Sequence, residues 1–219
     1  MAFRIVDGLL VGLLTVAMLA VSDPAWAGPP TEQLRAQMDR VIKVLEDPEL
    51  KREGRQVERR AAIRRLANEI FDFTETSRRS LGQHWQARTP AEREQFVRLY
   101  ADLMERSYIG KIEVYSGERI QFVGEMIERD QATVRTRLVT KAGTEIPVDY
   151  RMHRTAGDRW LTYDVAIEGV SLVANYRAQF NKIIQASGYQ ALVNKLTEKQ
   201  EQGLEADREP AIRKASQAK

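Results

Sequence analysis

Residues 131–154 read QATVRTRLVTKAGTEIPVDYRMHR, and mostly apolar side chains occupy every second position in both halves of this stretch. A period of two residues is typical of a β-strand with one buried face, because successive side chains point to opposite faces of a sheet. Ala142-Gly143-Thr144 separates the halves and is short enough for a hairpin turn. The stretch therefore predicts two antiparallel strands. Their inward positions are Ala132, Val134, Thr136 and Leu138, and then Ile146, Val148, Tyr150 and Met152.

The same alternation continues on both sides of this hairpin. Short connections at Arg129-Asp130 and Ala156-Gly157-Asp158 join it to an earlier and a later run. The earlier run, from Arg119, carries Ile120, Phe122 and Met126, and the later run carries Leu161, Tyr163, Val165 and Ile167. Together the four runs predict a four-stranded antiparallel meander with one apolar face.

Helical spacing of apolar residues flanks the predicted sheet. Before it, the three- and four-residue spacing covers 31–45, 63–74 and 96–108, and Thr89-Pro90-Ala91-Glu92 is a capping box for the third of these helices. After Glu168-Gly169 an apolar stripe runs to Gly188, and a last helix carries Leu192, Val193 and Leu196. This order predicts a single α+β domain, a twisted four-stranded antiparallel sheet packed with several helices.

The composition excludes several kinds of chemistry. The 219 residues include no cysteine and only two histidines, His84 and His153, so thiol catalysis, iron–sulfur clusters and zinc ribbons are excluded. Phosphate-loop, dinucleotide-binding and H-E-x-x-H motifs are absent from the sequence. The net charge of +3 does not indicate a nucleic-acid-binding protein. We expect no cofactor and no metal.

The two ends of the chain differ from its middle. Residues 1–27 combine Arg4, an apolar run over 8–21 and the small-x-small sequence Ala25-Trp26-Ala27, as in a cleaved secretory signal peptide. Export without cysteines predicts a bacterial periplasm. Residues 28–203 form the predicted domain, and the charged residues 204–219 predict a disordered tail.

Residues 51–65 carry seven positive charges against Glu53 and Glu58. Two interpretations stay open for this segment: the solvated face of an ordinary helix, and transient contact with anionic membrane lipids.

Three roles for the domain stay open from the residues alone. The inward strand residues are modest in size, so sheet and helices could meet in a solid core, as in a module that only binds other proteins, or enclose an apolar cavity. An enzyme with a cone-shaped α+β pocket would use Asp149 or Asp164 as a base with a raised pKa that points into the cavity. Otherwise Asp149 is a solvent-facing strand residue, and Asp164 is a buried structural carboxylate that accepts hydrogen bonds from the following turn.

A run near the end of the sheet resembles a known family. Residues 164–177 read DVAIEGVSLVANYR and resemble the MlaC-type, or toluene-tolerance, family of periplasmic phospholipid-binding proteins. The resemblance also covers Leu81-Gly82, Trp85, Thr89-Pro90, Phe96, Tyr108, the run Val148-Asp149-Tyr150-Arg151 and Trp160, in order over about 31–202.

The resemblance implies a twisted sheet and surrounding helices that hold the acyl chains of a glycerophospholipid. It implies a carrier without covalent chemistry, which moves lipid between an outer-membrane lipoprotein complex and the inner-membrane ABC transporter of the Mla system. A related branch is associated with hopanoid biosynthesis, so a hopanoid ligand stays open. We expect a monomer.

We predict a lipid pocket lined by inward strand residues and by the start of the following helix. Ser171 or Asn175 caps that helix, and Tyr108 and Tyr176 close the rim. The predicted lining residues are Val134, Leu138, Val148, Tyr150, Val165, Ile167, Val170 and Leu172.

Overall fold

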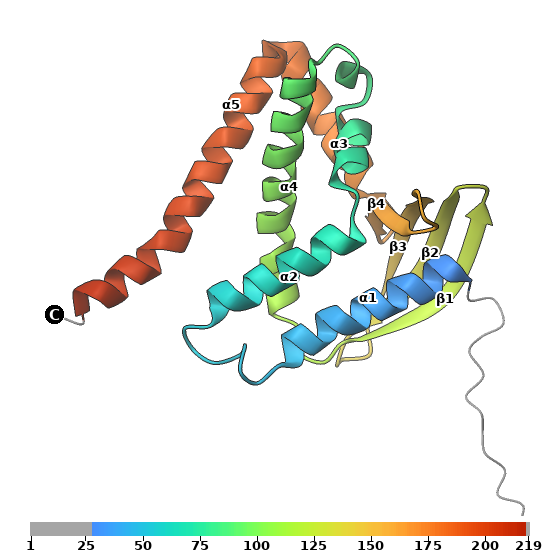
Figure 1. Ribbon diagram of the computed structural model, residues 1–219, viewed down its shortest axis with the longest axis vertical. Helices are drawn as coiled ribbons and strands as arrows, with labels where there is room; N and C mark the ends of the chain where they lie inside the picture. The colour runs from blue at the N-terminus through green and yellow to red at the C-terminus, as the bar shows by residue number, and fades with distance from the viewer. Residues whose placement is uncertain (1–27, 218–219) are drawn as a thin grey trace, which may run out of the picture.

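The computed structural model describes residues 28–217, which form an antiparallel sheet and five α-helices (Figure 1). The predicted signal peptide, residues 1–27, lies outside the described residues. The elements in chain order are α1 (Pro29–Glu46), α2 (Gln56–Ile70), α3 (Phe73–Leu81), the 3₁₀ helix η1 (Gly82–Trp85), α4 (Pro90–Glu113), β1 (Arg119–Glu128), β2 (Gln131–Val139), β3 (Glu145–Arg154), β4 (Trp160–Ile167), β5 (Val170–Ser171) and α5 (Leu172–Gln217).

The sheet is a meander in the order β1-β2-β3-β4-β5, and every neighbouring pair of strands is antiparallel. The α+β class is confirmed, but the predicted four strands are five. Glu168 and Gly169 have φ of 51° and 81°, so a two-residue turn folds Val170 and Ser171 back onto β4. A two-residue strand is too short to show an alternating pattern, which is why the sequence did not indicate it.

One face of the sheet carries Val134, Tyr150 and Val165, which lie opposite one another in register, and we call it the inner face. Two irregularities move predicted residues off this face. The register shifts after Phe122, so Met126 pairs with Thr133 on the other face and is 45% exposed.

The second shift lies on β4. Asp164 pairs with Arg151 and Thr162 with Met152, which leaves Tyr163 as the extra residue of a β-bulge. Leu161 and Tyr163 therefore face away from Val165 and Ile167, contrary to the simple alternation. Trp160 and Thr162 take the inner positions instead.

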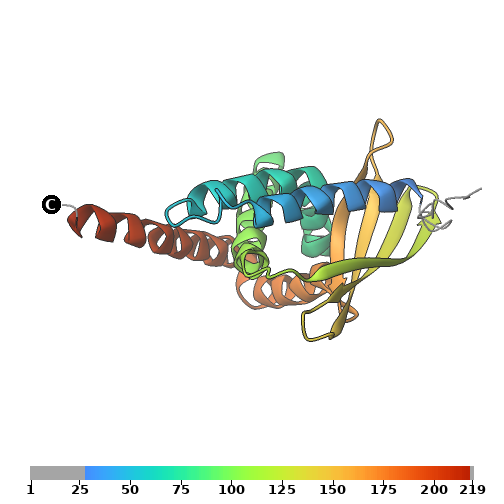
Figure 2. The same ribbon diagram turned by 90° about the horizontal axis from the view of Figure 1, so that it is seen from below.

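The described residues have two large apolar cores that are separate from each other. In the sheet core, α1 lies across the inner face of the curled sheet (Figure 2) and α2 adds Ile70. The helical core joins α3, η1, α4 and α5. The sheet core consists of Leu34, Ile70, Ala132, Val134, Met152 and Trp160, and the helical core of Leu81, Trp85, Phe96, Leu99, Tyr100, Phe180, Leu192, Val193 and Leu196.

Helix α5 breaks at Gly188, which the sequence predicts as a helix end. Its φ of 81° and ψ of 169° are not helical, and the second half of α5 turns back past the start of α4 (Figure 1). There the Tyr189 hydroxyl donates to the Glu92 carbonyl over 3.1 Å. The backbone is helical past Gly203 to Gln217. Ala, Glu, Arg and Lys favour helix, and this propensity does not depend on an apolar stripe.

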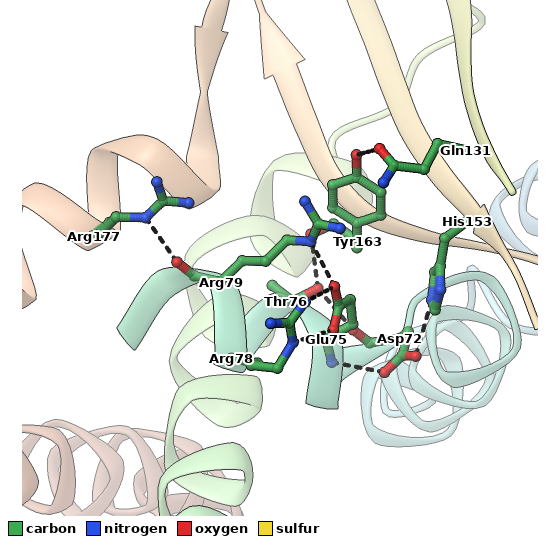
Figure 3. Close-up of polar contacts among 9 residues, drawn as sticks. All are labelled: Asp72, Glu75, Thr76, Arg78, Arg79, Gln131, His153, Tyr163 and Arg177. Atoms are coloured by element: carbon green, nitrogen blue, oxygen red, sulfur yellow. Dashed lines mark hydrogen bonds and ion pairs between the residues drawn. The ribbon is translucent and has the colours of Figure 1, made fainter. Parts of the chain in front are cut away.

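A polar joint fixes the start of α3 to β4 (Figure 3). Asp72 caps α3 by accepting from the Glu75 amide, and its other oxygen lies 3.0 Å from His153 Nε2 on β3. The Thr76 hydroxyl donates to the Tyr163 carbonyl over 2.9 Å, and the Arg79 guanidinium lies over the Tyr163 ring. These contacts hold the helical layer against the strand that carries the bulge.

Glu75 is the charged centre of this joint. Its carboxylate accepts two hydrogen bonds from Arg78, both 2.6 Å, and one from Arg79 at 2.7 Å (Figure 3). Hydrogen bonds from Arg78 and then Arg79, against the opposing effect of burial, lower the pKa of Glu75 to about 2.

We predict that Glu75→Gln lowers the free energy of unfolding at neutral pH by about 1–2 kcal/mol, since it removes charge-assisted hydrogen bonds. The folded-state pKa lies below the unfolded value, so the contribution is complete above about pH 4.5 and is lost as the pH falls towards 2. Urea unfolding across this range measures it. Glu94→Gln, which removes the exposed Arg98 pair, is the control and should change little. A Glu75 effect independent of pH would contradict the prediction.

Candidate functional site

The sheet brings most of the predicted lining residues to one face. Strand register places six of them together on the inner face, in neighbouring positions of β2, β3 and β4. Leu138, Tyr150, Val165 and Ile167 are half-buried and Val148 is nearly buried, whereas Val134 is fully buried in the sheet core. Val134 therefore packs beneath α1, and the accessible part of the inner face lies beside it.

The two residues after Ile167 in the predicted lining differ from each other. Val170 lies on β5 and is 59% exposed, so the structure does not bring it together with the strand residues. Val170 is exposed because the turn at Glu168-Gly169 places it on β5. The sequence pattern did not predict that this turn connects two strands. Leu172 begins α5 and is half-buried.

Tyr150 lies deep in the fold and still has accessible surface. Burial alone raises the pKa of its phenol to about 12, and no hydrogen bond to its hydroxyl is found among the described residues. Its ring packs against the sheet core. Tyr150 is therefore a partly accessible aromatic side chain at the margin of the sheet core.

Tyr108 on α4 and Tyr176 on α5 are brought together by the helical layer. Burial is the main cause that raises the pKa of Tyr108, followed by the nearby Tyr176 and a hydrogen bond between the two side chains. The Tyr176 ring packs on Tyr100 and Phe180, with centroid distances of 5.2 and 5.5 Å. The tyrosine pair is thus fixed to the edge of the helical core.

The C-terminal half of α4 is loosely covered. All eight residues from Ala101 to Tyr108 are half-buried, whereas Phe96, Leu99 and Tyr100 one turn earlier are buried. Leu103 and Met104 lie at the margin of the helical core. Residues 101–108 of α4 are therefore partly covered on every side and fully buried on none.

Charged pairs join this half of α4 to α2. Glu113 accepts from Arg59 over 3.3 Å and from Arg60 over 3.0 Å, and Glu105 accepts from Arg64. Much of the basic segment 51–65 is therefore occupied by contacts within the fold. Of its two open interpretations, the helix face is supported, but it is an ion-paired face rather than a fully solvated one.

Asp164 is a structural carboxylate, as one of the two interpretations predicts. It is 4% exposed and accepts from the Ser171 hydroxyl over 2.6 Å, the Val173 amide over 3.0 Å and Arg151 over 2.9 Å. Ser171 in turn accepts from the Ala174 amide over 3.0 Å, so it is the residue that caps α5. Asp164, Ser171 and Val173 all belong to the run that carries the family resemblance.

Neither candidate catalytic base lies on the inner face. Asp149 pairs with Arg135 and Ala166, and Asp164 pairs with Arg151, all on the opposite face from Tyr150. The cone-shaped enzyme needs one of these carboxylates in the cavity, and the register contradicts that geometry for both residues.

Some residues beside the inner face were not predicted as lining. Met38 on α1, Phe71 between α2 and α3, and Phe122 on β1 are half-buried against the sheet core. Phe71 forms an isolated bridge with Thr162 on β4. The helical spacing could have suggested Met38, but no local pattern indicates that Phe71 meets β4.

Two surface grooves were also considered as ligand sites, together with possible metal-binding clusters and membrane-spanning helices. The grooves, between α3 and α5 and between α4 and α5, include none of the ten predicted residues. Among the side chains that the structure describes, no three His, Asp or Glu residues gather in a metal-binding arrangement. No helix within residues 28–217 is both long and apolar enough to cross a membrane.

The site is thus a twisted antiparallel meander whose inner face is partly covered by α1 and which adjoins a separate helical layer. The MlaC protein family model matches residues 35–198, and the chain belongs to this family.

Two relatives agree with this assignment. The intermembrane phospholipid transport system binding protein MlaC of Haemophilus influenzae is 24% identical over 121 residues, which are 53% of this chain and 56% of that protein. The chain thus matches little more than half the length of this curated relative. The structure of a phospholipid-binding protein from Ralstonia solanacearum in complex with a phospholipid has a TM-score of 0.68 and 23% identity, over 79% of this chain and 97% of that one. This likeness shows the fold.

We predict that Asp164→Ala lowers the free energy of unfolding by about 3 kcal/mol, because it leaves Arg151, Ser171 and the start of α5 without their acceptor. Asp149→Ala is the matched control and should cost about 1 kcal/mol or less. Urea unfolding of both variants measures the difference. Equal effects would contradict the structural role given to Asp164.

Proposed function

We propose that this protein binds a phospholipid whose acyl chains lie between the inner face of the sheet and the helical core. The observation that carries the proposal is Tyr150, an aromatic side chain that lies between Val134 and Val165 on the inner face, packs against the sheet core and yet keeps accessible surface. Val165 and Ile167 on the sheet, together with Met104 on α4, offer half-buried apolar surface on either side. Tyr108 and Tyr176 stand at the margin, where they can close over a bound chain.

Energetics favour such a carrier. Each methylene removed from water contributes about 0.8 kcal/mol, so two acyl chains contribute more than about 20 kcal/mol relative to water. Lipid in a bilayer is already out of water, so transfer from a membrane into the protein lies close to balance. A protein of this kind can therefore both take up and release its ligand.

We further propose that the protein is exported to the periplasm and carries phospholipid between the two Mla complexes of the inner and outer membranes. Support comes from membership of the MlaC family and from the H. influenzae relative, whose name describes a binding protein of an intermembrane phospholipid transport system. Uptake and release of the lipid require no covalent chemistry by this chain. The direction of lipid transport must therefore come from the partner complexes.

Native mass spectrometry of the purified protein tests lipid binding. We expect a co-purified ligand with the mass of a glycerophospholipid, and renewed uptake from phosphatidylglycerol vesicles after the ligand has been removed. If the co-purified ligand has the mass of a hopanoid instead, the protein binds a hopanoid and not a phospholipid. Absence of both ligand and uptake would contradict the proposal.

Filling the proposed space provides a test by mutation. We predict that Val165→Trp lowers vesicle uptake by at least about tenfold, because an indole in this position occupies the space of an acyl chain. Val170→Trp is the matched control, since its side chain is exposed, and it should leave uptake unchanged. Circular dichroism verifies that both variants are folded. Equal uptake by the two variants would refute the assigned location.

A further inference from the structure

We propose that removal of the signal peptide creates a structural ion pair, in which the new α-ammonium group of Gly28 binds the Glu125 carboxylate and fastens α1 to β1. The inference depends on the export proposed above and not on the identity of the ligand. It concerns the first residue after the predicted Ala25-Trp26-Ala27 cleavage sequence.

One carboxylate receives the start of α1. Gly28 N lies 2.6 Å from Glu125 Oε2, and Glu125 Oε1 accepts from the Thr31 amide over 2.8 Å and from the Thr31 hydroxyl over 2.9 Å. Thr31 is fully buried, and Glu125 is half-buried on the inner face opposite Val134. Glu125 is thus a partly desolvated anion on a face that otherwise carries mainly apolar residues.

Glycine in the first position leaves room for this contact. A Cβ atom on residue 28 would lie 2.5 Å from the present position of Glu125 Oε2, so the carboxylate would have to shift to admit a larger residue. With Gly28, the backbone nitrogen reaches the carboxylate where Thr31 holds it.

Cleavage changes the charge of this contact but not its atoms. A membrane-bound endopeptidase adds water across the Ala27–Gly28 peptide bond, Ala27 leaves as a carboxylate, and Gly28 N gains protons. The amide donor becomes an ammonium group, because an α-amino group with an ordinary pKa of about 7.7–8.0 is largely charged at neutral pH. Charge-assisted hydrogen bonds are roughly twice as strong as neutral ones.

The contact controls how firmly α1 covers the sheet core. Helix α1 contributes the buried Leu34 to that core, and Gln33 holds the helix a second time through the backbone of Trp160. Cleavage changes the charge at the Glu125 contact, whereas the Gln33 contact involves no charged group. The new ion pair should therefore hold α1 more firmly in the exported chain than the neutral amide does in the precursor.

A comparison of two N-termini tests the inference. The chain beginning at Gly28 is prepared with a free amine and with an Nα-acetyl group, which keeps the N–H but removes the charge as the precursor's peptide bond does. We expect acetylation to lower the folded-to-unfolded ratio about fivefold to tenfold in the otherwise unchanged chain, and less than about twofold in Glu125→Gln. Urea unfolding measures both ratios.

Matched variants keep the test decisive. Gln33→Ala weakens the other attachment of α1, so acetylation should keep its full effect there. Gly28→Ala displaces the Glu125 carboxylate from its present position and should make the effect of acetylation smaller. An equal effect of acetylation with and without Glu125, or an exported protein whose intact mass does not begin at Gly28, would overturn the inference. Vesicle uptake by the same proteins tests the proposed function separately, and its loss alone would leave the ion pair standing.

Discussion

The structure depends on the buried Asp164 carboxylate, which joins the last long strand to the first turn of α5. Because it accepts from Arg151, Ser171 and Val173, it fixes the direction in which α5 leaves the sheet. Phe180, Leu192 and Val193 on α5 belong to the helical core. The position of that core relative to the sheet therefore depends on one carboxylate and a turn with two positive φ values.

Polar contacts keep the two layers attached while their apolar cores stay separate. The joint around Asp72 and Glu75 holds α3 to β4, and Glu113 and Glu105 hold α4 to α2. Hydrophobic contact alone would drive the layers together, since it is non-directional. Directional hydrogen bonds and ion pairs at the periphery can instead fix a spacing, and apolar side chains such as Tyr150 and Val165 then remain only half-buried.

Residues 164–177, which carry the family resemblance, have structural roles in the fold. Asp164 and Ser171 form the junction with α5, Glu168 and Gly169 form the turn, and Val165 and Ile167 supply the inner face. Each has a packing or capping role in the fold. The phospholipid binding proposed for this chain would need apolar surface of suitable shape rather than a reactive group.

The sequence by itself determined the α+β order, the inner face of β2 and β3, the capping box at Thr89 and the break at Gly188, because each depends on local spacing or on one residue's backbone preference. Only the tertiary structure decided the bulges that place Met126 and Tyr163 on the opposite face of the sheet from Val165. The same is true of the short strand β5, in which Val170 is exposed, and of the bridge between Phe71 and β4. Bulges and bridges arise from pairing between distant segments, and periodicity within one segment contains no information about its partner.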